Sequence, residues 1–380
     1  MSLRTASIKL EITPDQGKRL ADLQAAFSKA CNLLVPYVCG HRVWNRVALH
    51  NLTYDLLRRQ TPLGSQMCCN TIWSVCQAYR SQKKRGRIRK DGPVPRLHFD
   101  RASVHFDKRT YTLAGETLSL YTLQGRIRVR MRLGEHQRRL LDQGTPKEAE
   151  LVCRKGQWYF NLVVELEDPD PVTAGPVMGV DVGENNLAAT STGKVFGGGR
   201  LRHRQDQHLT LIRRLQKAKS NGSRSAAQRL RQVSGKAGRR NSCVNHQISK
   251  AIVAEAQRTQ TAVIVLEDLT HIRDRIKAGK RVRARLHRWP FRQLQKQIEY
   301  KAADVGIRVI YVDPAHTSQT CSECGCLGRR VKHLFECECG FRAHADCNAA
   351  RNLARIGGST LPPRAAVNTP NVPMGSHTIH

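Results

Sequence analysis

The chain has 380 residues, and its 64 lysines and arginines outnumber its 30 aspartates and glutamates, so the formal charge is +34. This length allows about two or three domains with cores of their own. It therefore excludes the possibility that the whole chain is a basic disordered tail. The charge excludes an ordinary enzyme for a small neutral substrate. It indicates a polyanionic partner, either nucleic acid or an anionic membrane surface.

The membrane alternative finds no support in the sequence. No run approaches about 18 apolar residues, the length of a transmembrane helix, and the N-terminus lacks the apolar core of a signal peptide. Of the 13 cysteines, five lie between Cys321 and Cys339. That clustering suits a metal site in a reduced compartment better than a disulfide framework. We therefore expect a cytoplasmic, nucleoid-associated prokaryotic protein.

The first 170 residues predict a mixture of strands and helices. Residues 6–12 alternate apolar and polar side chains, as a half-buried strand does. Thr13 followed by Pro14 predicts a helix start, and apolar residues on one face predict that this helix ends near Pro36. Further helical patterns cover residues 50–60 and 65–82. These helices would be inserted between the N-terminal strand and later strands.

Strand patterns return after residue 100. Residues 126–133 alternate strictly, with arginines on one face, and residues 151–167 predict a hairpin that turns at Lys155 and Gly156. Together with the N-terminal strand they predict a small β-barrel-like module. A linker rich in proline and glycine then marks a domain boundary, with Pro169, Pro171, Gly175 and Pro176.

The second half predicts an α/β domain. Buried strands are expected at residues 177–182, 262–266 and 307–312, and another begins within 188–191. Residues 200–250 are strongly basic and predict one or two helices with a break at 220–223, and residues 291–303 predict another helix. Strands that alternate with helices indicate an α/β fold. Residues 357–380, rich in Gly, Pro, Ser and Thr, predict a disordered tail.

Three carboxylates stand where predicted elements end or begin. Asp181 ends the strand in GVDVG, Glu267 ends the strand in VIVLEDL, and Asp346 begins a short helix in ADCNAARN. A carboxylate beside apolar residues is costly unless it is paired or binds a cation. Three of them suit two Mg²⁺ ions, which can activate water for phosphodiester hydrolysis. The alternative is three unrelated acids in salt bridges or helix caps.

Two cysteine pairs predict a second, separate metal site. Cys321 and Cys324 form a C-x-x-C pair, and Cys337 and Cys339 form a C-x-C pair. Four thiolates suit tetrahedral Zn²⁺ and leave no open position, so this zinc would be structural. The second pair has one residue between its cysteines, where C-x-x-C has two. The fourth ligand could therefore be Cys339 or one of three substitutes: Cys326, His333 and His344. The alternative is a group of free thiols.

These segments resemble the TnpB family of transposon-encoded, RNA-guided nucleases, which are related to type V CRISPR effectors. The resemblance rests on GVDVG, VLEDL, ADCNAARN and the cysteine pairs, and it extends over residues 289–306 and 313–325. It implies a RuvC-like (RNase H-type) core in which Asp181, Glu267 and Asp346 are catalytic and hold Mg²⁺. Asp268 is not counted as a ligand, because it should face the other way on an extended strand.

The resemblance also implies a domain organisation. Residues 1–12 and 100–170 would form a β-barrel wedge-like module, and residues 13–99 an inserted helical recognition region. Residues 171–356 would form the RuvC-like nuclease domain, with a zinc-binding insert at 315–345, and residues 357–380 the tail.

Several basic segments are candidates for nucleic-acid contact. Residues 80–96, 126–132 and 200–240 would bind an RNA scaffold and its heteroduplex through backbone and shape. Residues 270–289 follow Glu267 and would form a basic lid over the acids. The simpler alternative is an exposed flexible loop for residues 80–96 and an exposed charged helix for residues 270–289. The four tryptophans are interpreted as core residues rather than as stacking platforms: Trp44, Trp73, Trp158 and Trp289.

The leading interpretation is a monomeric RNA-guided DNA endonuclease. A guide RNA from a transposon end would pair with double-stranded target DNA beside a short flanking motif, and one Mg²⁺-dependent site would cut both strands in turn. The first alternative is an RNA- or DNA-binding transposon regulator with little cleavage. The second is an unguided, structure-specific nuclease.

Overall fold

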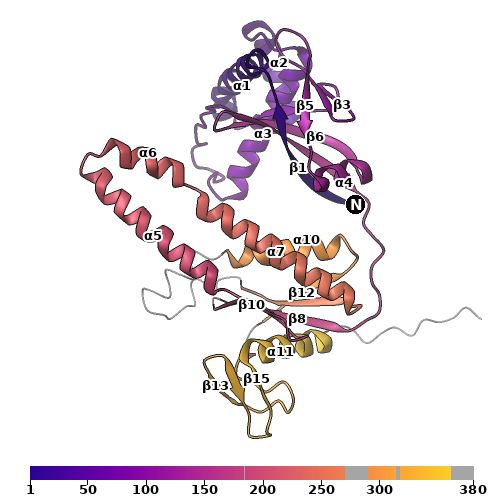
Figure 1. Ribbon diagram of the computed structural model, residues 1–380. Coiled ribbons are helices and arrows are strands. Elements are labelled where there is room, and N and C mark those ends of the chain that lie inside the picture. Colours follow the sequence, from indigo (N-terminus) through magenta and orange to yellow (C-terminus); the bar gives the residue numbers. More distant parts are fainter. Residues whose placement is uncertain (184, 270–289, 314–316, 361–380) are drawn as a thin grey trace, which may run out of the picture. The chain divides into compact units, whose positions relative to one another are not determined.

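The computed structural model describes residues 1–183, 185–269, 290–313 and 317–360. The chain divides into two compact units, Met1–Glu167 and Asp168–His380, and the boundary falls at the start of the predicted linker (Figure 1). None of the described helices is long and apolar enough to span a membrane.

The first unit contains one antiparallel, nearly closed, barrel-like sheet of seven strands in the order β2-β6-β7-β1-β5-β4-β3. The predicted hairpin turn is confirmed, since Lys155 and Gly156 have φ angles of 54° and 77° between β6 and β7. The strands are β1 (Ser2–Glu11), β2 (Val104–Phe106), β3 (Tyr111–Ala114), β4 (Thr117–Leu120), β5 (Ile127–Arg132), β6 (Thr145–Arg154) and β7 (Gln157–Leu166).

Three helices lie between β1 and β2 in the chain: α1 (Pro14–His41), α2 (Arg46–Gln60) and α3 (Ser65–Lys84). Thr13 caps α1 in a capping box with Gln16, as the sequence predicted for its start. The predicted end near Pro36 is wrong, because α1 continues to His41. Proline removes one backbone hydrogen bond, but Val35 and Val38 on either side of it are buried, so packing keeps the chain helical. The short helix α4 (Glu135–Gln143) precedes β6.

The second unit is built on a mixed five-stranded sheet in the order β10-β9-β8-β11-β12. The strands β8, β11 and β12 run parallel, while β9 and β10 run antiparallel to their neighbours. Their bounds are β8 (Val177–Asp181), β9 (Asn186–Thr190), β10 (Val195–Gly197), β11 (Val263–Glu267) and β12 (Arg308–Val312). The α/β fold class predicted for this half is confirmed.

Helices cover both faces of this sheet. On one face, Val180 and Leu266 share a core with α7 (Lys236–Arg258) and α10 (Phe291–Ala303). On the other face, Val263 and Val265 pack against α11 (Ala345–Thr360). Figure 1 shows α7 and α10 on one side of the sheet and α11 on the other. The alternation of each strand therefore decides which helix a given side chain meets.

Glycines let α11 approach the sheet closely. A Cβ atom on Gly179 of β8 would lie 1.9 Å from the carbonyl oxygen of Ala350, and one on Gly357 would lie 2.3 Å from Val265 Cγ2. Both positions thus require glycine for steric reasons. The predicted tail begins too early, since α11 continues through Gly357 to Thr360. Tight packing, rather than flexibility, explains a glycine there. Residues 361–380 lie outside the described part of the chain.

The basic stretch after β10 forms three helices rather than one or two: α5 (Gly199–Ser220), α6 (Arg224–Val233) and α7. The predicted break at 220–223 is confirmed. A second break separates α6 from α7 at Ser234 and Gly235, because Gly235 takes a left-handed φ of 74° that ends the helical geometry.

A small three-stranded sheet lies between β12 and α11 in the chain. It consists of β13 (Arg329–Val331), β14 (Leu334–Glu336) and β15 (Arg342–His344), paired antiparallel. Phe335 is fully buried between its strands and the cysteines. We call residues 317–344 the ribbon, since this segment carries the cysteine pairs.

Candidate active site

Asp181 and Glu267 stand side by side at the ends of neighbouring parallel strands. Leu266 of β11 pairs with Val180 of β8, so the next residues along both strands are Glu267 and Asp181. Both acids share the alternation of the residues that face α11. The predicted strand-end positions are thus confirmed, and the sheet register brings these two carboxylates to one edge.

Asp346 reaches the same place from the first turn of α11. Its side chain is largely buried, and the coulombic influence of both Asp346 and Glu267 extends to Asp181. One carboxylate oxygen, Oδ1, accepts a hydrogen bond from Arg330 Nη2 at 2.7 Å, and the other accepts one from Asn186 Nδ2 at 2.8 Å. The three predicted acids therefore converge, although they come from sequence positions far apart.

Burial and like charges destabilise the ionised acids. Removal of water raises the pKa of Asp181 well above its usual value, and the neighbouring Glu267 and Asp346 carboxylates raise it further, whereas Arg330 opposes the shift. Burial raises the pKa of Glu267 to about 7, with a small opposing effect of the Thr317 hydroxyl. Two neighbouring carboxyls with raised pKa values, Asp181 and Glu267, are typical of a site that binds a cation.

The sequence reasoning missed the groups that hold these acids. Arg330 and Thr317 come from the ribbon, and Thr317 Oγ1 donates to Glu267 Oε1 at 3.4 Å. Gln295 on α10 is almost fully buried and donates to the main-chain oxygen of Glu267 at 2.7 Å. Asn186 lies at the start of β9. No spacing rule in the sequence links these residues to the acids, since each contact is made across separate elements.

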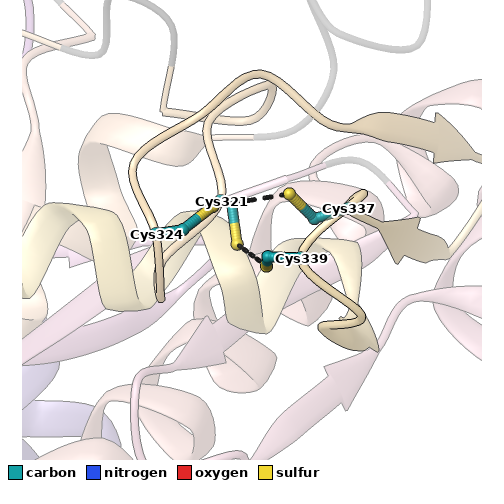
Figure 2. Close-up of side chains that lie close together, drawn as sticks. All are labelled: Cys321, Cys324, Cys337 and Cys339. Atoms are coloured by element: carbon teal, nitrogen blue, oxygen red, sulfur yellow. Dashed lines mark hydrogen bonds between the residues drawn. The ribbon is translucent and has the colours of Figure 1, made fainter.

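The four predicted cysteines form a compact cluster. The sulfur atoms of Cys321, Cys324, Cys337 and Cys339 all lie within 4.8 Å of one another (Figure 2). Two of the sulfur–sulfur distances are 3.8 Å and 3.5 Å. Four sulfurs at about 2.3 Å from a tetrahedral zinc would stand about 3.8 Å apart, so the cluster fits that ion.

The cluster bears on the choice of the fourth ligand. Cys339 belongs to it, and the substitutes Cys326, His333 and His344 do not. Within the described ranges, this is the only group of three or more Cys, His, Asp or Glu residues gathered that closely. The carboxylates of Asp181, Glu267 and Asp346 do not form a group that close. A wider set of ligands is compatible with two ions that stand about 3.5–4 Å apart.

The predicted basic surfaces differ in how they are organised. In the 80–96 segment, the Arg42 side chain donates to the main-chain oxygens of Arg89, Lys90 and Gly92, which pins the loop. On β5, buried residues alternate with exposed arginines. The helices α5 and α6 carry mostly exposed basic side chains. The predicted lid at 270–289 lies outside the described residues.

The predicted core role of the tryptophans is confirmed for one of them and is partial for two. Trp158 is buried within the core of the first unit, and Trp44 packs against that core while partly exposed. Trp73 is also partly exposed, and its ring stacks on His105 with centroids 3.8 Å apart. Trp289 lies outside the described residues.

Two family models match this chain. One, described as "Probable transposase" (OrfB_IS605), matches residues 161–273. The other, described as "Cas12f1-like, TNB domain", matches residues 291–353. Between them they include all three acids and all four clustered cysteines.

Known relatives point in the same direction. A "CRISPR-associated endodeoxyribonuclease Cas12f1" of Sulfoacidibacillus thermotolerans is 36% identical over 219 residues, which are 53% of this chain and 50% of that protein. This chain therefore spans only about half the length of that relative. A TnpB-like protein of Methanocaldococcus jannaschii is 27% identical over 280 residues, 68% of this chain and 99% of that protein.

The fold agrees with a solved structure of a related kind. A chain in the "Cryo-EM structure of the Cas12f1-sgRNA-target DNA complex" superposes with a TM-score of 0.65 at 15% identity, over 90% of this chain and 83% of that one. At this identity the likeness establishes the fold. Taken with the two family models and the relatives, it leads to one conclusion: the chain is similar to TnpB-like proteins and to Cas12f1 nucleases, with a transposase-type segment at residues 161–273 and a Cas12f1-like segment at residues 291–353.

Proposed function

We propose that the protein is an RNA-guided DNA endonuclease with a single RuvC-like (RNase H-type) active site. The observation that carries the proposal is the convergence of Asp181, Glu267 and Asp346 at one edge of the second sheet. The names of the relatives support it, since one is called an endodeoxyribonuclease and the fold neighbour was solved with a guide RNA and target DNA.

The three acids would hold two Mg²⁺ ions. Bound there, the ions would supply an activated water and stabilise the leaving oxygen of the phosphodiester. The protein's own groups would hold the carboxylates in place: Arg330 and Asn186 on Asp346, and Thr317 on Glu267. Arg330 is partly exposed, so its guanidinium is also available to a phosphate that enters the site.

The cysteine cluster would hold one structural Zn²⁺. All four ligand positions would be thiolates, which leaves none for water or substrate. The ion would keep the ribbon folded on α11. Arg330 and Thr317 reach the acids from the ribbon. Its contribution would thus be to the geometry of the site and not to the chemistry.

The first unit would supply recognition. Its barrel-like sheet would form the wedge-like module, and α1–α3 would form the recognition region. Several basic surfaces are candidates for contact with RNA and DNA backbones. They are the exposed arginines of β5, the 80–96 loop held by Arg42, and the helices α5 and α6 of the second unit. The assembly would be a monomer on a guide RNA from a transposon end. It would cut both strands of DNA in turn, in the prokaryotic nucleoid.

The acid cluster predicts a pH dependence with a definite sign. The pKa of Glu267 rises from 4.5 to about 7 on folding, so the metal-free folded state binds a proton that the unfolded state releases. This contribution to stability is complete below about pH 4.5 and is lost as the pH rises through about 7, to the extent of about 3 kcal/mol. The shift of Asp181 has the same sign.

Thermal unfolding of the zinc-loaded protein in buffer free of Mg²⁺ should therefore show lower stability at about pH 8 than at about pH 6. The rise in melting temperature on adding Mg²⁺ should be larger at the higher pH, because protons compete with the metal. Glu267→Gln should flatten both trends. If the rise in melting temperature on adding Mg²⁺ did not depend on pH, the assignment of Glu267 as a metal ligand would be contradicted.

The deciding experiment is to purify the protein, expressed with its native downstream flank, in high salt and to sequence the RNA that remains bound. High salt is needed because a protein of charge +34 retains random nucleic acid by counterion release. A discrete RNA with a constant scaffold and a variable 3′ end should copurify, and it should direct cleavage of matching DNA. A mixture of cellular RNAs would contradict guidance. Binding to DNA without RNA and without cutting would favour the regulator, and cutting of branched DNA without RNA the unguided nuclease.

A further inference from the structure

Two asparagines on α11 tie the ribbon to the helix that carries Asp346. Asn348 and Asn352 lie one turn apart and are 0% and 2% exposed. Both side-chain amides donate to the main-chain oxygen of Thr320 at 2.7 Å, and Asn352 also donates to that of Thr317 at 2.9 Å. Asn348 Oδ1 accepts from the main-chain nitrogen of Ser322 at 2.9 Å. We call this pair the asparagine latch.

The latched segment leads directly to both metal sites. Thr320 precedes Cys321, the first cysteine of the cluster. At its other end, Thr317 donates its hydroxyl to the carboxylate of Glu267. Asn352 therefore holds the main chain of a residue whose side chain holds a proposed metal ligand.

The chemistry of the latch favours positioning over simple packing. The neighbouring positions of α11 that face the sheet carry small or apolar residues such as Ala350 and Leu353. A buried asparagine is a poorer helix former than these, and its amide loses its hydration. In return, its amide donates to main-chain oxygens of the segment that precedes Cys321. Such directional bonds hold a loop in one register, which an apolar contact does not do.

We propose that Asn348 and Asn352 are positioning residues for the proposed nuclease reaction, and that Asn352 acts on Glu267 through Thr317. The inference rests on the proposed function, since it assumes that Glu267 serves the reaction. Residues that orient metal ligands in this way contribute about 10- to 100-fold to activity or metal affinity.

The test compares Asn352→Leu with a matched substitution elsewhere. Asn245 on α7 is fully buried, and its amide donates to the Pro290 oxygen and to Gln293 Oε1, which belong neither to the ribbon nor to the three acids. Asn352→Leu should lower the single-turnover cleavage rate by about 10- to 100-fold while zinc content and target affinity stay at the wild-type level. Asn245→Leu should leave the rate per folded molecule unchanged. Equal losses in the two variants would overturn the proposal.

A double-mutant cycle tests the route through Thr317. If Asn352 acts through Thr317, Asn352→Leu combined with Thr317→Val should be no slower than the slower single variant, within about twofold. Independent roles would instead multiply the two losses. That result would refute the route through Thr317.

A second readout separates this inference from the proposed function. The rise in melting temperature with Mg²⁺ alone should require higher Mg²⁺ in Asn352→Leu than in Asn245→Leu, whether or not DNA is cut. If the wild-type complex does not cleave, the proposed function fails, and the Mg²⁺ titration still decides on positioning. Identical Mg²⁺ titrations of the two variants would overturn the positioning role of Asn352.

Discussion

Asp181→Asn should abolish guided DNA cleavage, with a loss of about a thousandfold or more in rate, which corresponds to roughly 4 kcal/mol of transition-state stabilisation. Asparagine keeps the shape of the side chain and removes the charge that would hold Mg²⁺ between β8 and the neighbouring acids. Guide RNA and target DNA should still bind with nearly unchanged affinity, because one carboxylate makes little difference to a protein of charge +34. Single-turnover cleavage with a matched binding assay measures both.

A neighbouring acid provides the control for this prediction. Asp268 directly follows Glu267 but is exposed, and Asp268→Asn should cut DNA at the wild-type rate. Without Mg²⁺, Asp181→Asn should also be no less stable than the wild type, because the carboxyl that it removes is destabilised when ionised. Lost cleavage would then not reflect misfolding. Cleavage by Asp181→Asn at the wild-type rate would disprove the assignment of the acids.

Cys321→Ser combined with Cys324→Ser should release one zinc ion per chain and unfold the ribbon. Structural zinc contributes about 10–16 kcal/mol of apparent binding free energy in small zinc domains, and here it would be bound mainly by the folded state. Because Arg330 and Thr317 belong to the ribbon, cleavage should be lost as well. Zinc content by plasma emission spectroscopy and thermal unfolding measure the two effects.

Cys326 offers a control within the same loop. It is exposed and lies two residues after Cys324, yet it does not belong to the cluster. Cys326→Ser should therefore retain zinc, stability and cleavage. Zinc content unaffected by the double substitution would rule out the thiolate site, and loss of zinc in Cys326→Ser would show that the fourth ligand was wrongly chosen.

The two predictions bear on the alternative functions in different ways. A transposon regulator would need the zinc ribbon if the ribbon binds nucleic acid, but it would not need Asp181. An unguided nuclease would need both, but not the RNA. The Asp181 variant thus separates binding from cutting, and the copurified RNA separates guided from unguided cutting.

Local chemistry made much of the second unit predictable. The strands around Asp181 and Glu267 are short apolar runs ending in a carboxylate, and the structure places them within a residue or two of the predicted bounds. The cysteine cluster was equally predictable, because the spacing of the cysteines within each pair is a local feature of the sequence. The end of α1 and the start of the tail were not predictable, because the packing around Val38 and Gly357 keeps the chain helical there despite a nearby proline or glycine.

The sequence by itself determined which residues are candidates for the chemistry: the three acids at the ends of elements, the four cysteines and the excess of positive charge. Only the tertiary structure decided what surrounds them. The contacts of Arg330 with Asp346, of Thr317 with Glu267 and of the latch with the ribbon join residues from separate elements. A spacing rule describes neighbours along a strand or helix. Which elements meet is decided by burial of apolar faces, here by α11 packing against a sheet whose Gly179 leaves it room.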